Sequence, residues 1–130
     1  MSEKKLKSYR KLVRKCEDLE KRIKEKDNEL TRIKSPQMSD MPVLRGKSFD
    51  DLIIKVAELK EAYHSKYLAA LRLCQEIENA IDGLEDEDDQ LAARLYYIDG
   101  LPWWKVALKI PCGEAEIYRK RKEILNKLTA

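Results

Sequence analysis

The chain is poor in the residues that build metal sites and disulfide frameworks. It has a single histidine, His64, and three cysteines that stand far apart, at positions 16, 74 and 112. An odd number of cysteines at such spacing indicates neither a disulfide set nor a zinc cluster. No candidate nucleophile or paired carboxylate flanks His64. We therefore expect buried reduced thiols, a structural His64, no metal or cofactor, and a protein that is not an enzyme.

Long apolar runs are also missing. No stretch approaches the roughly 18 residues of a membrane-spanning helix, and the lysine-rich N-terminus lacks the apolar segment of a secretory signal. These absences predict a cytoplasmic protein without a membrane partner. With 130 residues, 39% of them charged, and only one Phe and four Gly, the composition favours a small all-α protein.

Residues 1–34 carry apolar side chains in a heptad pattern, which is typical of a long coiled-coil-like helix. Lys26 interrupts one of its two rows, and Ser35-Pro36 ends the pattern. One row is Tyr9, Cys16, Ile23 and Leu30, and the other is Leu12, Leu19 and Ile33. Residues 35–47 hold two prolines and a glycine, and they predict a linker.

A second long helix is expected over residues 48–84, with Ser48 as its N-cap. It has two apolar rows: Val56, Tyr63, Ala70, Ile77 and Leu84, then Ile53, Tyr67, Cys74 and Ile81. Two helices of matched length predict either an antiparallel hairpin or an intermolecular coiled coil, and the pattern does not choose between them. Because the stripe of the second helix widens at Tyr67 and Leu71, we also expect a homodimer through residues 1–82.

Residues 85–130 predict a three-helix helix-turn-helix module. The acidic run Glu85–Asp89 lacks the spacing of a calcium loop and instead fits a helix start, where carboxylates complement the helix dipole. That helix would continue to Ile98 and support the motif from behind. The motif itself has Pro102 in the first turn of a short helix, a break at Pro111-Cys112-Gly113, and a helix from about Glu114 to Leu128.

The two faces of the motif differ in chemistry. Inward positions are apolar at helical spacing: Trp103, Val106, Ala107 and Ile110 on the first helix, then Ile117, Ile124 and Leu128 on the second. Residues 102–130 carry seven basic and three acidic groups, and lysine and arginine supply most nonspecific DNA affinity. The outer face near the start of the second helix would enter the major groove. The predicted DNA-contacting residues are Glu114, Ala115, Tyr118, Arg119 and Lys122, with Lys105 and Lys109 reaching phosphates.

The residues Tyr97–Leu101, Trp103, Val106-Ala107 and Ile117–Arg119, with Leu125 and Leu128, resemble the fourth conserved region of bacterial sigma factors. The closer resemblance is to small phage and prophage late-gene regulators of the RinA/ArpU type, whose linker is similar to residues 35–42. The resemblance implies a regulator from a phage or prophage of Gram-positive bacteria that binds promoter DNA, with RNA polymerase as a further partner. Two alternatives stay open: a small-terminase-like DNA-packaging protein, and a coiled-coil scaffold that binds RNA polymerase or a sigma factor.

Overall fold

The computed structural model describes residues 1–34, 47–111 and 113–130, and every regular element within these ranges is a helix. The expected all-α class is confirmed. None of the helices described is both long and apolar enough to cross a membrane. The elements are α1 (Glu3–Lys34), α2 (Lys47–Asp82), α3 (Glu87–Ala93), the π-helical turn η3 (Arg94–Ile98), α4 (Trp103–Lys109) and α5 (Glu114–Thr129).

The ends of the helices differ slightly from the prediction. Helix α2 begins at Lys47, so Ser48 lies inside the helix rather than at its N-cap. Asp86 caps α3, accepting a hydrogen bond from the backbone N–H of Asp88 at 2.9 Å. The acidic run therefore does start a helix, at Glu87, two residues after the first residue of the run. The predicted linker before Lys47 lies outside the described residues, as does Cys112.

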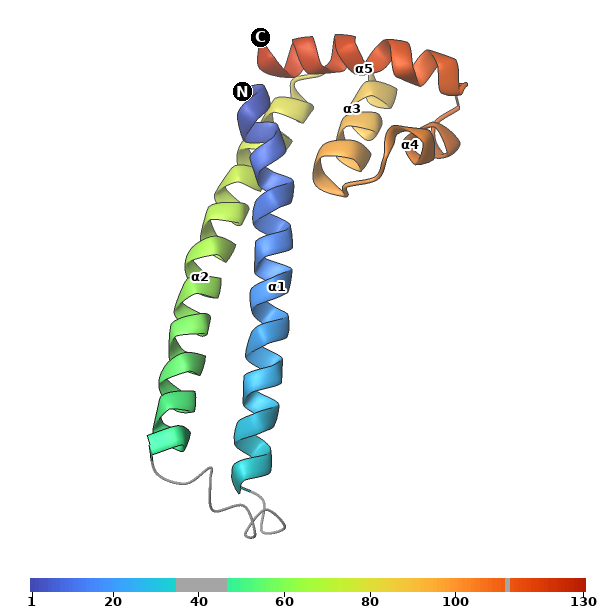
Figure 1. The fold of residues 1–130 in the computed structure, drawn as a ribbon. Coiled ribbons are helices and arrows are strands. Elements are labelled where there is room, and N and C mark those ends of the chain that lie inside the picture. Colours follow the sequence, from blue (N-terminus) through green and yellow to red (C-terminus); the bar gives the residue numbers. More distant parts are fainter. Residues whose placement is uncertain (35–46, 112) are drawn as a thin grey trace. The chain divides into compact units, whose positions relative to one another are not determined.

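The chain divides into two compact units. Residues 1–13 and 69–130 form one, which we call the core unit, and residues 14–68 form the other, the hairpin unit. Both long helices contribute to both units. Within each unit the segments of α1 and α2 lie side by side and run in opposite directions (Figure 1). Of the two predicted pairings of the long helices, the structure therefore shows the intramolecular hairpin.

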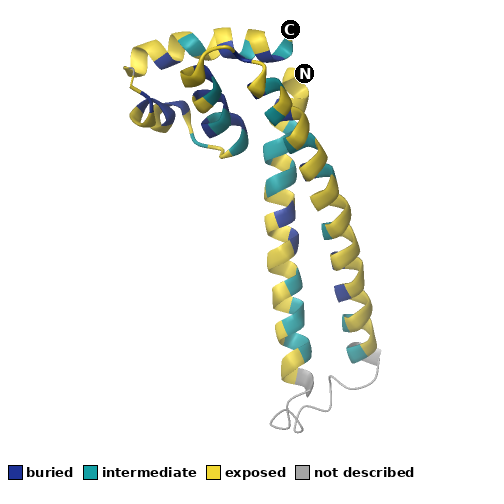
Figure 2. Cartoon of the chain, turned by 180° about the vertical axis from the view of Figure 1, so that it is seen from behind, coloured by how far each residue is buried: buried dark blue, intermediate teal, exposed yellow. Residues whose placement is uncertain are grey.

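The hairpin unit buries few side chains. Cys16 and Leu19 from α1 and Val56 and Leu59 from α2 are the buried ones among its described residues, and most of its helical surface is exposed (Figure 2). Burial raises the pKa of the Cys16 thiol, in keeping with the expected reduced, buried cysteine. Lys26 interrupts the seam as predicted: it is half-buried, and its ammonium lies 3.6 Å from the Glu29 carboxylate.

The second predicted row of α2 turns inward only over part of its length. Ile53 and Tyr67 are 45% and 44% exposed, Cys74 is half-buried, and Ile81 is fully buried. A straight α-helix drifts by about 20° per heptad, so residues spaced by seven do not keep one orientation. His64, expected to be a structural residue between two seams, is instead exposed.

The core unit encloses one apolar cluster of fifteen buried side chains. Its members come from α3, η3, α4 and α5, together with the last turns of α2 and the first turns of α1. Leu6, which the heptad rows did not include, is among its most buried residues. The predicted three-helix module is therefore part of a larger core, completed by Leu6, Ile77 and Ile81.

An aromatic group joins η3 to α4 inside this core. Tyr96 stacks on Trp103 with ring centroids 4.2 Å apart, and Tyr97 meets Tyr96 edge-on at 4.8 Å. Tyr97 also lies near Trp103, with the two ring centroids 6.4 Å apart. Two consecutive tyrosines of the π-helical turn thus contact the same indole. Burial raises the pKa of Tyr97 to about 12.

The turn before α4 is held by a residue of α1. Gly100 adopts a φ of +76°, and the Leu101 N–H reaches the Leu95 carbonyl at 3.0 Å, which closes the end of η3. The Arg10 guanidinium donates to the Ile98 carbonyl at 2.9 Å. A Cβ added at Gly100 would come within 2.5 Å of that guanidinium. Glycine is therefore favoured here by its positive φ, and a larger residue would in addition displace the Arg10 guanidinium.

Candidate nucleic-acid interface

Helix α4 presents the predicted inward face. Pro102 is the N-cap, one residue outside the helix and not in its first turn as expected, and its carbonyl accepts from the N–H groups of Lys105 and Val106. A proline loses nothing at this position, because its missing N–H would have no helical partner. The four inward side chains, Trp103, Val106, Ala107 and Ile110, are buried as predicted.

Pro111 and Gly113 set the end of α4 and the start of α5. Ile110 is extended, with φ −116° and ψ 141°, because a residue before proline is driven out of the helical region. Gly113 is the N-cap of α5 and has no side chain to cap the helix. Its carbonyl accepts the Ile117 N–H at 3.1 Å. Helix α4 therefore ends before Pro111 and α5 begins after Gly113, while Cys112 between them lies outside the described residues.

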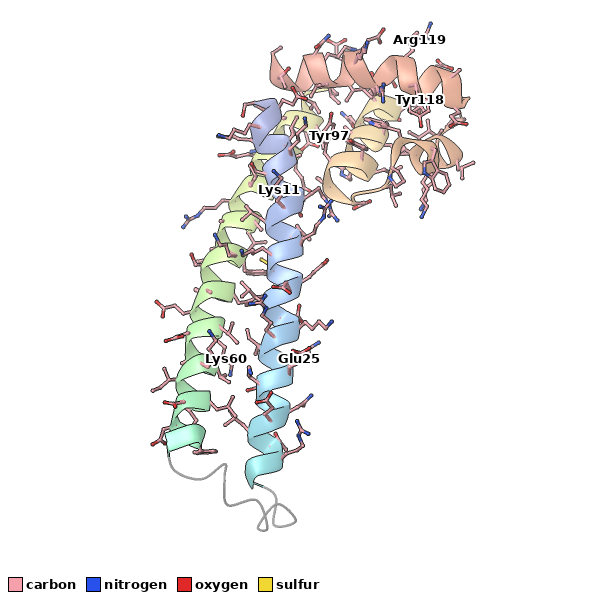
Figure 3. The ribbon with its side chains drawn as sticks, viewed as in Figure 1. Lys11, Glu25, Lys60, Tyr97, Tyr118 and Arg119 are labelled. Carbon is pink, nitrogen blue, oxygen red and sulfur yellow. The ribbon has the colours of Figure 1, made fainter. Side chains whose placement is uncertain are left out.

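Helix α5 separates an apolar face from a charged one. Ile117, Ile124 and Leu128 are buried, as predicted, while Tyr118 and Arg119 project from the exposed part of the helix (Figure 3). All the residues predicted to contact DNA are exposed: Glu114, Ala115, Tyr118, Arg119 and Lys122 on α5, and Lys105 and Lys109 on α4.

Several exposed cations make only weak local contacts. Arg119 lies 3.7 Å from the Glu116 carboxylate, and exposed pairs of this kind contribute little to stability. The Arg121 guanidinium carbon is 5.1 Å from the centre of the Tyr118 ring. Arg121 was not among the predicted contact residues, although its position three residues after Tyr118 would have signalled that the two side chains lie together. A ligand phosphate could replace these contacts at small cost.

Two other cations of α5, Lys120 and Lys127, contact carboxylates at the start of α3. Asp89 of α3 is buried, and its two carboxylate oxygens lie 3.6 Å from Lys120 Nζ and 3.6 Å from Lys127 Nζ. Lys120 also lies 3.8 Å from the Asp86 carboxylate. Burial lowers the pKa of Lys120, but the attraction of Asp89 and Asp86 outweighs it, so the pKa of Lys120 is raised. The acidic helix start thus also fastens α5 to α3.

The cations of α5 therefore fall into two groups: those that pair with the acidic residues of α3 and those that stay exposed. Lys120 and Lys127 are seven residues apart and therefore share one face of the helix, which is the signal the sequence offered for a common acidic partner. Arg119, Arg121 and Lys122 remain exposed on the rest of the helix. The acidic segment therefore pairs with Lys120 and Lys127, and the cations on the outer face of α5 stay available to a ligand.

Helix α4 also exposes an apolar pair. Trp104 is 50% exposed and Leu108 is 78% exposed, and Lys105 Nζ lies 5.3 Å from the Trp104 ring. Because the two residues are four positions apart on the helix, their side chains lie on one face. Both side chains are therefore largely accessible on the surface of the core unit.

A family model described as "Protein of unknown function (DUF1492)" matches residues 32–129, and the chain belongs to this family. The match covers α2 and the whole of the helix-turn-helix. Searches of curated proteins and of solved structures find no significant match.

Proposed function

We propose that the protein is a phage or prophage transcription regulator that binds promoter DNA through α4 and α5, as a sigma-region-4-like module in the cytoplasm. The observation that carries this proposal is the division of charge on α5. Its apolar residues pack inward and two of its lysines contact the buried Asp89, while Tyr118, Arg119, Arg121 and Lys122 are exposed and make only weak local contacts. A rigid helix whose outer face is cationic is the form that enters a major groove.

The proposed roles differ between residues. Arg119 and Lys122 lie one turn apart and would read base edges, where a bidentate arginine contact with guanine contributes about 1–3 kcal/mol of discrimination. Glu114 would accept a hydrogen bond from a cytosine amino group. Lys105 and Lys109 of α4 would contact flanking phosphates and carry no sequence information.

Gel-shift titrations between roughly 50 and 200 mM salt test the proposal, because phosphate contacts make binding salt-dependent. Duplexes from the phage's late promoter, its packaging site and an unrelated sequence should be compared. Arg119→Ala should weaken promoter binding by about 1–3 kcal/mol and relax one base preference. Lys109→Ala should weaken all duplexes similarly and reduce the salt slope by about 1.

Lys127→Ala is the matched control, since this lysine of α5 faces Asp89. Its DNA affinity should equal that of the parent chain. Parent-like binding by both Arg119→Ala and Lys109→Ala would show that the orientation is wrong, and preference for the packaging site would favour the small-terminase-like alternative.

The exposed Trp104–Leu108 pair favours a second function, in which the module also binds protein. RNA polymerase or a sigma factor is the expected partner, either together with DNA or, for a coiled-coil scaffold, in its place. A Leu108→Ala variant should retain DNA affinity and lose retention on immobilised RNA polymerase. Retention equal to that of the parent would remove this role.

A further inference from the structure

The first turns of α1 carry a second concentration of positive charge in the core unit. Residues 4–13 contain no acidic residue and five cations, which are Lys4, Lys5, Lys7, Arg10 and Lys11. Lys4, Lys7 and Lys11 stand at i, i+3 and i+7, so they share one face of the helix. All three side chains are exposed, and Lys11 is labelled on α1 in Figure 3. We call these three residues the lysine face.

The lysine face is anchored to the helix-turn-helix. Leu6 is 1% exposed inside the apolar cluster of the core unit, and Arg10 donates to the Ile98 carbonyl at 2.9 Å, just before the turn that leads into α4. Lys7 and Lys11 each follow one of these anchors directly. The exposed cations of α1 therefore belong to the same compact unit as α4 and α5.

Little of the charge on the lysine face is used within the protein. Lys7 Nζ lies 3.3 Å from the Glu3 carboxylate, but both side chains of this pair are more than half exposed, so the pair contributes little to stability. Among the described residues, Lys4 and Lys11 have no carboxylate within ion-pair distance. An anionic ligand could therefore bind this face without breaking a contact that holds the fold.

The chemistry of the lysine face fits a polyanion and not a protein. Protein interfaces are anchored by large aromatic and apolar side chains and are depleted in lysine. No large apolar side chain is exposed anywhere in residues 1–34, so a protein partner would find no anchor there. From Lys4 to Lys11 the helix rises by roughly 10 Å, a length over which one DNA strand carries about three phosphates.

We propose that the lysine face of α1 contacts phosphates of the same duplex that α4 and α5 bind, outside the base pairs read by α5. This inference rests on the proposed promoter binding and adds to it a backbone contact from α1. A lysine ammonium is a point charge that binds phosphate without reading base edges. The contact therefore adds affinity for every duplex long enough to reach α1, and it adds no sequence preference.

Gel-shift titrations of the full chain on a promoter duplex test this contact with two double variants of equal charge. Lys4→Ala combined with Lys11→Ala should weaken binding about tenfold at roughly 50 mM salt and reduce the salt slope by about 2, because two phosphate contacts are lost. The matched control combines Lys21→Ala with Lys24→Ala, which removes two exposed lysines farther along α1. The control should keep the parental affinity and slope.

Duplex length supplies a second measurement. The parent chain should bind a duplex that extends beyond the footprint of α5 more tightly than one trimmed to that footprint. The Lys4/Lys11 double variant should gain nothing from the added length. An RNA duplex of the same length is titrated in parallel, and far-ultraviolet circular dichroism checks that each variant keeps its helices.

The outcomes separate this contact from the promoter binding on which it rests. Parental affinity and slope in the Lys4/Lys11 double variant, with Arg119→Ala still weakened, would overturn the α1 contact alone. An equal loss in the control would show a general effect of net charge and would overturn it as well. A loss seen only with the RNA duplex would assign the face to RNA instead. A parent chain that binds no duplex would overturn both proposals.

Discussion

The core unit and the hairpin unit are built from the same two long helices, yet they bury very different amounts of apolar surface. Fifteen buried side chains form one cluster in the core unit, against four buried side chains in the hairpin unit. The difference arises because α3, η3, α4 and α5 cover the helix ends in the core unit, while two helices alone have only one shared seam. A two-helix hairpin therefore has little stability of its own.

The largest expected effect tests how closely the side chains of the core unit are packed. Trp103→Ala should destabilise this unit by about 3–5 kcal/mol, because it removes a buried ring that stacks on Tyr96. Chemical denaturation followed by circular dichroism measures the loss. Trp104→Ala, the adjacent and half-exposed tryptophan, should cost less than about 1 kcal/mol. Equal losses for the two variants would contradict the assignment of the inner face of α4.

A smaller effect is expected from the hairpin unit. Leu59→Ala should cost about 2–4 kcal/mol of local stability, because Leu59 is one of few buried side chains there. Both tryptophans of the chain lie in the core unit, so their fluorescence should report an unchanged transition while helix content falls at a lower temperature. Lys55→Ala on the same helix should change neither signal. If fluorescence and helix content shift together, the two units unfold as one.

The next effect concerns the buried carboxylate of the core unit. Asp89→Asn should destabilise the core unit by about 1–2 kcal/mol, since two charge-assisted contacts are lost. The cost stays moderate because both lysine side chains are partly exposed. The exposed neighbour Asp88, changed to Asn, serves as the control. An unchanged denaturation midpoint for Asp89→Asn would show that the link between α3 and α5 contributes nothing.

The smallest effect is expected at alkaline pH and concerns two tyrosines of the core unit. Burial, with the nearby Cys74 thiol as a second cause, raises the pKa of Tyr9 to about 12, and burial raises the pKa of Tyr97 to about 12. Unfolded tyrosine loses its proton near pH 10. Stability from these two phenols is therefore complete below about pH 10 and is lost as the pH rises through about 12.

Tyrosinate absorbance followed against pH measures this directly. Tyr9→Phe and Tyr97→Phe should each remove one late-titrating phenol from the curve. A parent chain whose six tyrosines all ionised near pH 10, while still folded, would contradict the burial of these two in the core unit.

Much of the fold could be predicted from residue spacing alone. The inward residues of α4 and α5 were all identified, because short helices bounded by Pro102, Pro111 and Gly113 leave little choice of register. The second row of α2 was wrong at Ile53 and Tyr67, since the rotation of a straight helix accumulates over several heptads. The π-helical turn at Arg94–Ile98 could not be predicted either, because its single-residue offset leaves no periodic signal.

The candidate site shows the same division. Exposure of the predicted contact residues follows from their spacing opposite Ile117 and Ile124. The spacing does not show which cations of α5 are paired within the protein and which are available to a ligand. That distinction requires knowing that Asp89 is buried between Lys120 and Lys127. Arg121 was overlooked for a related reason: net charge alone does not reveal which cations are already paired.

The amino-acid sequence by itself determined the helical class, the boundaries set by proline and glycine, and the inner faces of the last two helices. These depend on local backbone chemistry and on periodicity over a few turns. Only the tertiary structure decided that Leu6 and Ile81 complete the core of the helix-turn-helix, that Arg10 closes on Gly100, and that Ile53 and Tyr67 of α2 stay exposed. Each of these depends on contacts between residues far apart in the chain, or on rotation accumulated along a long helix, which no local pattern records.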